Sequence, residues 1–155
     1  MFRTVKQKFS MLKSQYTIFN ENGQPVLEAN RGKMSSKLIM TDMNGNEVMT
    51  IERQGIFNSK YIASIFGQPV FAFIKSTGIM KNTYSFEGTT FYRDGNFRSK
   101  DYEIIDGNRP AARVTSKFLS VSDEYSVEIY DDRDELMILA IILTSDMAQE
   151  MEAKK

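Results

Sequence analysis

The chain contains neither cysteine nor histidine. Without cysteine there is no disulfide, no thiolate nucleophile and no sulfur ligand for a metal. Without histidine, the commonest general base near neutral pH is missing, and so are Ser-His catalytic pairs and most zinc sites. We therefore expect a protein that is not an enzyme and that needs no metal or cofactor.

A long apolar run is also absent. The longest one, at 136–143, would span only about 12 Å as a helix, whereas the hydrocarbon core of a bilayer is about 30 Å thick. The opening segment MFRTVKQKFSMLK scatters four bases among its apolar residues and has no continuous apolar region typical of a signal peptide. These patterns predict no transmembrane span and a cytoplasmic location.

The charge balance favours neither acidic nor basic partners, because 20 Lys and Arg residues match 20 Asp and Glu residues. Hydrophobic residues make up 41% of the chain and charged residues 26%. This composition is typical of a globular domain rather than a disordered segment. At 155 residues, the chain is expected to form a single domain, 1–155, with one core.

A repeat of 22 residues organises the first half. The tetrapeptide GQPV occurs at 23–26 and again at 67–70, and GNEV lies midway at 45–48. Short alternating segments flank each of these glycines, and Asn-Gly is the dipeptide typical of a type I′ hairpin turn. We predict three hairpins, the first two with such turns. The third has a different turn at 67–69, where Pro69 must begin a strand or lie at a sheet edge, because proline cannot donate to a ladder.

The remaining strands follow the same spacing. Segments rich in Tyr, Phe, Val, Ile and Thr alternate with turn residues up to residue 130, which gives about twelve short strands over 3–130. An acidic stretch, with Asp132 and Glu135 spaced as in a capping box, precedes the apolar run LMILAIIL. A helix that is apolar on every face must be surrounded. The fold class is therefore predicted as mainly β: a closed barrel of hairpins around a central helix at about 133–150.

Three segments together resemble the LURP-one-related family: KQKFSMLKSQYTIFNENGQPV, YEIIDGNRPAARVTSKFLSVSDEYSVEI and DEYSVEIYDDRDELMILAIILTSDM. The fold of this family is shared with the tubby C-terminal domain and the phospholipid scramblases. The resemblance implies a twelve-stranded barrel threaded by its C-terminal helix. Tubby domains bind phosphoinositide headgroups, but none of their site motifs aligns residue by residue here, so no site residue is carried over.

Several constellations have competing interpretations. Asp42, Asn44 and Asn46 resemble the start of a calcium loop, but the glycine is misplaced and a hairpin turn explains them better. The acids at 131–135 could hold calcium, although helix capping accounts for them. The segment FYRDGNFRSKDY interleaves arginines and aromatics as a nucleic-acid surface does, yet its acids and the neutral net charge favour an ordinary barrel wall.

The loops between successive hairpins carry the main functional hypothesis. They read RGKMSSK at 31–37, RQGIFNSK at 53–60 and KSTGIMK at 75–81, and the shared repeat register predicts that all three emerge at one barrel rim. The predicted rim consists of the bases Arg31, Lys33, Lys37, Arg53, Lys60, Lys75 and Lys81. The opposite rim is predicted to hold the acids Glu21, Asp42, Glu47, Asp131, Asp132 and Asp134.

This basic rim has two interpretations. In one, the protein is a non-catalytic binding module whose bases meet anionic phospholipid headgroups or a membrane surface. In the other, the loops only close the barrel mouth while their bases stay hydrated. The alternative function is a protein-protein interaction or scaffold domain without a lipid ligand.

Overall fold

The computed structural model describes residues 1–9, 13–32, 35–55, 59–77, 82–95, 101–118 and 122–152. These residues form twelve strands, a short 3₁₀ turn η1 (Asp132–Asp134) and one helix, α1 (Glu135–Glu152). The strands are β1 (Phe2–Phe9), β2 (Lys13–Phe19), β3 (Pro25–Gly32), β4 (Lys37–Asp42), β5 (Glu47–Gln54), β6 (Lys60–Ile65), β7 (Gln68–Thr77), β8 (Asn82–Glu87), β9 (Phe91–Asp94), β10 (Tyr102–Asp106), β11 (Arg109–Phe118) and β12 (Ser122–Ile129).

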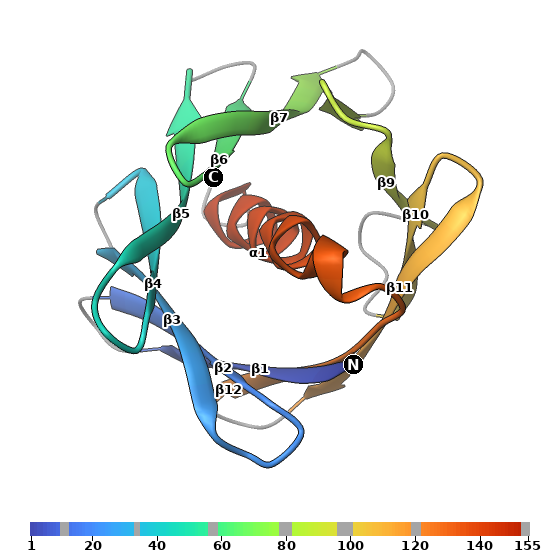
Figure 1. The fold of residues 1–155 in the computed structure, drawn as a ribbon. Coiled ribbons are helices and arrows are strands. Elements are labelled where there is room, and N and C mark those ends of the chain that lie inside the picture. Colours follow the sequence, from blue (N-terminus) through green and yellow to red (C-terminus); the bar gives the residue numbers. More distant parts are fainter. Residues whose placement is uncertain are drawn as a thin grey trace.

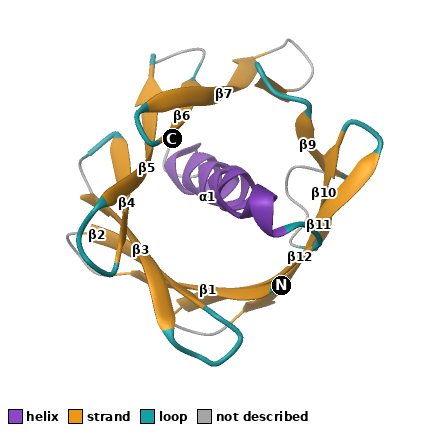
Figure 2. Ribbon diagram, viewed as in Figure 1, coloured by secondary structure: helices purple, strands orange, loops and turns teal. Residues whose placement is uncertain are grey.

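All twelve strands belong to one antiparallel sheet that curls around α1 (Figure 1). The strand order is β8-β7-β6-β5-β4-β3-β2-β1-β12-β11-β10-β9. The first strand therefore lies in the middle of the sheet, where it pairs with β2 on one side and β12 on the other. Figure 2 shows the helix on the barrel axis, with strands on every side. The predicted mainly β barrel around a central helix is confirmed.

The predicted closure of the barrel is incomplete. Within the described residues no ladder joins β8 to β9, which are the two ends of the strand order. Only the segment 88–90 separates these strands in sequence, so they lie together at one end. The partly buried side chains of Tyr84, Phe86 and Phe91 pack against the core here. Aromatic side chains thus cover the core beside this seam, while the backbones of β8 and β9 are not paired with each other in the described residues.

The turns of the first two hairpins differ from the prediction. Among the described residues, Phe66 is the one non-glycine residue with a positive φ, so Asn22 and Asn44 do not adopt the type I′ geometry. In the first hairpin, the Gly23 N–H donates to the Asn20 carbonyl at 3.0 Å, and Gly23 has a φ of 77°. This is a type I turn followed by a left-handed glycine.

The cause is the residue that begins each turn. The side-chain oxygens of Asn20 and Asp42 accept backbone N–H bonds from residues two and four positions later, which stabilises the wider turn. The third hairpin has Ser64 at this position, and Ser64 instead pairs with Pro69 across the ladder. Its loop is therefore the two-residue pair Phe66 and Gly67, with φ of 49° and 80°.

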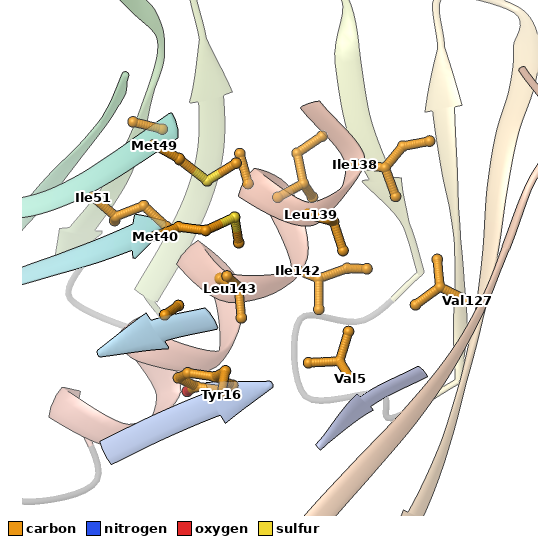
Figure 3. Close-up of a cluster of buried hydrophobic side chains, with 14 of the residues drawn as sticks. Val5, Tyr16, Met40, Met49, Ile51, Val127, Ile138, Leu139, Ile142 and Leu143 are labelled. Atoms are coloured by element: carbon orange, nitrogen blue, oxygen red, sulfur yellow. The ribbon is translucent and has the colours of Figure 1, made fainter. Parts of the chain in front are cut away.

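The core consists of inward side chains from the strands packed around α1. Figure 3 shows Met40, Met49 and Val127 around Leu139, Ile142 and Leu143. Residues 138–148 of the helix are all buried, whereas 136 and 137 are only partly buried. The predicted burial of 136–143 is thus shifted toward the C-terminus, because the first turn of the helix lies at the barrel mouth.

The helix also begins differently from the prediction. The side chain of Asp131 accepts the N–H of Arg133 and caps the 3₁₀ turn, and the helix proper starts at Glu135. Glu135 pairs with Arg3 of β1 instead of completing a capping box. Among the described residues, neither α1 nor any other helix has an apolar stretch of the length that a bilayer requires.

Candidate functional site

The loops predicted to form the basic rim emerge at one end of the barrel. Because successive strands run in opposite directions, the β3–β4, β5–β6 and β7–β8 connections lie at the same end, and the Asn-Gly turns lie at the other. Arg31, Arg53 and Lys75 lie near the ends of β3, β5 and β7. Lys37 and Lys60 begin β4 and β6. We call this the basic end.

Three of these bases continue the inward-facing rows of their strands. Each base lies two positions after a buried core residue. Alternate residues of a strand share a face, so each base faces the barrel interior. The buried residues are Ala29 before Arg31, Ile51 before Arg53, and Phe73 before Lys75. The 22-residue repeat therefore directs three cations toward the axis, around the last turns of α1.

Arg31 is buried in the barrel. It is 2% exposed, and its Nη2 donates to Glu150 Oε1 at 2.7 Å, while its Nη1 donates to the carbonyl of Ser35 at 3.2 Å. Glu150 also accepts from Ser14 Oγ at 2.8 Å and from Gln7 Nε2 at 3.3 Å. This network joins the last turns of α1 to β1, β2 and β3.

Arg53 and Lys75 have equivalent surroundings. The backbone N–H of Arg53 donates to the carbonyl of Ser36 at 2.8 Å, and that of Lys75 donates to the carbonyl of Ser59 at 3.0 Å. Arg53 Nη2 also donates to Ser59 Oγ at 3.0 Å. Both side chains are half-buried. The residue just before β4 thus holds the backbone of Arg53 at the end of β5, and the residue just before β6 holds the backbone of Lys75 at the end of β7.

The predicted rim residues therefore divide by exposure. Lys37 and Lys60 are exposed, Arg53 and Lys75 are half-buried, and Arg31 is buried. Lys33 and Lys81 lie outside the described residues. The same holds for the apolar loop residues Met34, Ile56, Phe57, Ile79 and Met80. Among the described residues of the predicted rim, the exposed bases are the lysines that begin β4 and β6.

A second polar cluster lies deeper, along the same part of the helix. The carboxylate of Asp146 accepts hydrogen bonds from the hydroxyls of Tyr16 and Tyr125. Arg93 lies over the ring of Tyr102, with 3.7 Å between the guanidinium carbon and the ring centroid. A cavity of about 10 Å³ separates these groups, which is room for about one water molecule.

Burial dominates the electrostatics of this cluster. It raises the pKa of the Asp146 carboxyl, although the bonds from Tyr125 and Tyr16 act in the opposite direction. Burial also raises the pKa values of the Tyr16 and Tyr125 hydroxyls, and the nearby Asp146 charge adds to this effect. The hydroxyls therefore remain protonated donors throughout the neutral range.

Asp146 and Glu150 were not among the residues to which the sequence pattern assigned a structural role. Their signal was present in the spacing: the two carboxylates are four residues apart, so they share one helix face directly after an apolar run. A carboxylate on a helix enclosed by a barrel must find donors on the wall. Polar inward residues on β1, β2, β3 and β12 supply them.

The acids of the opposite rim lie at the other barrel end, as predicted, in the turns and at η1. Several are paired: Asp131 with Arg133 at 2.7 Å, and Asp134 with Arg109 at 3.0 Å. Hydrogen bonds from Arg133 lower the pKa of Asp131 to about 2. Bases from η1 and from the start of β11 thus partly neutralise this end.

The hairpin interpretation of Asp42 is confirmed. Asp42 Oδ1 accepts the N–H groups of Asn44 and Asn46, both at 2.9 Å, and Oδ2 accepts from the Asn46 side chain at 3.1 Å. These bonds, chiefly the one from the Asn46 backbone, lower the pKa of Asp42. The Asp42 carboxylate therefore stabilises the hairpin turn.

Comparison with known proteins agrees with this architecture. A family model described as LURP-one-related matches residues 2–146. The uncharacterized protein YxjI of Bacillus subtilis is 27% identical over 146 residues, which cover 92% of this chain and 90% of that protein. A solved Arabidopsis thaliana structure shares the fold at a TM-score of 0.64 and 13% identity, over 96% of this chain and 91% of the other. The chain therefore belongs to the LURP-one-related family.

Proposed function

We propose that this protein is a non-catalytic binding module whose basic end binds the headgroups of an anionic phospholipid surface, reversibly and without insertion. The observation that carries the proposal is the common register of the bases on β3, β5 and β7, together with the lysines that begin β4 and β6. The acids at the opposite end orient the barrel, because an anionic surface attracts one end and repels the other.

The burial of the individual bases defines which of them make the contact. Arg31 is excluded, since its guanidinium is already paired with Glu150 inside the barrel. Lys37 and Lys60 are exposed and make the first contacts, while Arg53 and Lys75 lie half-buried behind them. A base near an acidic leaflet contributes about 1 kcal/mol, so these few bases give weak binding that salt reverses.

The test is sedimentation with phosphatidylcholine vesicles that either contain or lack phosphatidylserine. We expect the protein to sediment with the acidic vesicles at low salt and to be released at high salt. The variant Lys37→Glu/Lys60→Glu should lose this binding. Both lysines are exposed, so the variant should fold as the parent does.

A matched control reverses two bases on the outer wall, Lys6→Glu/Arg113→Glu. These side chains are 53% and 62% exposed and lie in β1 and β11, away from the basic end. The change in net charge is the same, so only the position differs. Equal loss in both variants would mean non-specific attraction. No preference of the parent for acidic vesicles would leave the scaffold interpretation in its place.

A further inference from the structure

Within the part of the chain that the structure describes, the sheet ends at β8 and β9, and these two edge strands differ in how they are protected. Strand β9 has only four residues, and its Arg93 is directed inward over Tyr102. Short edge strands and inward-pointing charges are the usual means of preventing further strand addition. Strand β8 has six residues, and its ladder to β7 runs without a bulge. Its described sequence, NTYSFE, contains no proline and no lysine.

An apolar groove lies on the outer face of the barrel beside β8. It has a volume of about 320 Å³, and its lining is mostly apolar. The lining residues are Ile62, Pro69, Val70, Phe71, Ala72, Glu87 and Gly88. Glu87 is the one charged residue among them and stands at the end of β8. The groove therefore extends from β6 and β7 to the C-terminal end of β8.

Phe66 lies at the tip of the hairpin that supplies most of this groove. It is 67% exposed and has a φ of 49°, a conformation that is unfavourable for an aromatic residue and natural for asparagine or glycine. Asn22 and Asn44 occupy the equivalent positions of the first two hairpins. An exposed aromatic in a strained turn does not stabilise the isolated fold, whereas it is typical of a contact residue.

We propose that β8 receives an extended segment of a protein partner, which adds to the sheet as a further antiparallel strand. Main-chain hydrogen bonds along β8 supply the pairing, as in other complexes formed by strand addition. An apolar side chain of the segment enters the groove and contacts Phe66, and a lysine or arginine of the segment pairs with Glu87. The site lies on the barrel wall, so it is independent of lipid binding at the basic end.

The probe is a displayed library of random nine-residue peptides, selected against the immobilised full chain. We expect enriched peptides to combine alternating apolar residues with a base. One enriched peptide, made synthetically, should slow amide hydrogen exchange at every second residue of β8, because only alternate N–H groups of a strand point to its outer edge, and should leave the amides of β9 unchanged. Failure to enrich any peptide, or protection that maps elsewhere, would overturn the proposal.

Two variants and their matched controls complete the test. Glu87→Lys and Phe66→Asn should each weaken peptide binding about tenfold. The controls Asp94→Lys and Tyr92→Asn make the same changes at exposed positions of β9 and should leave the affinity unchanged. Phe66→Asn also relieves the strained turn, so weaker binding cannot be ascribed to unfolding. Equal effects in variants and controls would contradict the assignment to β8.

Discussion

The buried carboxylate of Asp146 should contribute to stability because it accepts hydrogen bonds from two tyrosine hydroxyls. Replacing Asp146 with alanine leaves the hydroxyls of Tyr16 and Tyr125 without this acceptor inside the barrel. A buried donor left unsatisfied costs about 1–3 kcal/mol, so Asp146→Ala should lower the free energy of unfolding by about 2–6 kcal/mol. That is a large part of the roughly 5–15 kcal/mol typical of a domain.

Two further variants separate hydrogen bonding from simple loss of volume. Asp146→Asn keeps one oxygen that can accept from a tyrosine, so it should cost less than Asp146→Ala. The triple variant Asp146→Leu/Tyr16→Phe/Tyr125→Phe removes the donors together with the acceptor. Replacing both partners of a buried polar pair with apolar groups is often nearly neutral, so the triple variant should be more stable than Asp146→Ala.

Urea unfolding followed by circular dichroism measures these differences, provided that the denaturant dependence stays the same among the variants. A loss of less than about 0.5 kcal/mol in Asp146→Ala, within the range of an ordinary surface substitution, would contradict this role of the carboxylate. The same role would also be refuted if the triple variant were the least stable of the set.

The same carboxyl predicts an unusual dependence of stability on pH. Burial raises its folded-state pKa above the ordinary value of 3.8. The folded state therefore binds the proton more tightly, and this stabilisation is fully present below about pH 4 and is lost as the pH rises through the higher folded-state pKa. The groups around the carboxyl are Tyr16, Tyr125, Asp123, Glu150 and Arg93. As the pH falls, the free energy of unfolding of the parent should rise relative to that of Asp146→Asn. A difference between the two proteins that does not change with pH would contradict this.

Three further predictions concern the turn, the end of the helix and the core. Phe66→Asn should raise the free energy of unfolding by about 1 kcal/mol in urea titrations, because asparagine tolerates the left-handed turn better. Arg31→Ala and Glu150→Ala should each cost about 3 kcal/mol, and a double-mutant cycle should give a strong coupling energy; additive losses would argue against the pair. Leu139→Asp buries an unpaired charge at a fully buried position, so a variant with an unchanged melting temperature would exclude the central-helix packing.

The barrel could be predicted because its signals are local and repeated. The 22-residue spacing predicted three hairpins, and the apolar run at 136–143 required a surrounding sheet. The turn type could not be predicted from Asn-Gly alone, since the choice depends on whether Asn20 or Asp42 accepts backbone N–H groups before the glycine. Whether the barrel closes depends on whether β8 pairs with β9, and no local sequence pattern indicates this.

The basic end illustrates a second limit. The repeat register predicted correctly that Arg31, Arg53 and Lys75 share one end of the barrel, but it did not predict that their side chains face the axis. Charge in a loop-like segment suggests solvation, whereas Arg31 lies on an inward position of β3 opposite Glu150. The partner is 119 residues away in sequence, so only the assembled barrel brings the two together.

The central position of β1 in the sheet has a consequence for synthesis on the ribosome. Strand β1 can pair with β2 as soon as both emerge, but its other edge waits for β12, which is more than a hundred residues later. The apolar lining of the barrel waits still longer, because α1 follows all twelve strands in sequence. A nascent chain that still lacks the helix exposes the inner faces of its strands, so we expect it to need protection from aggregation until α1 has been made.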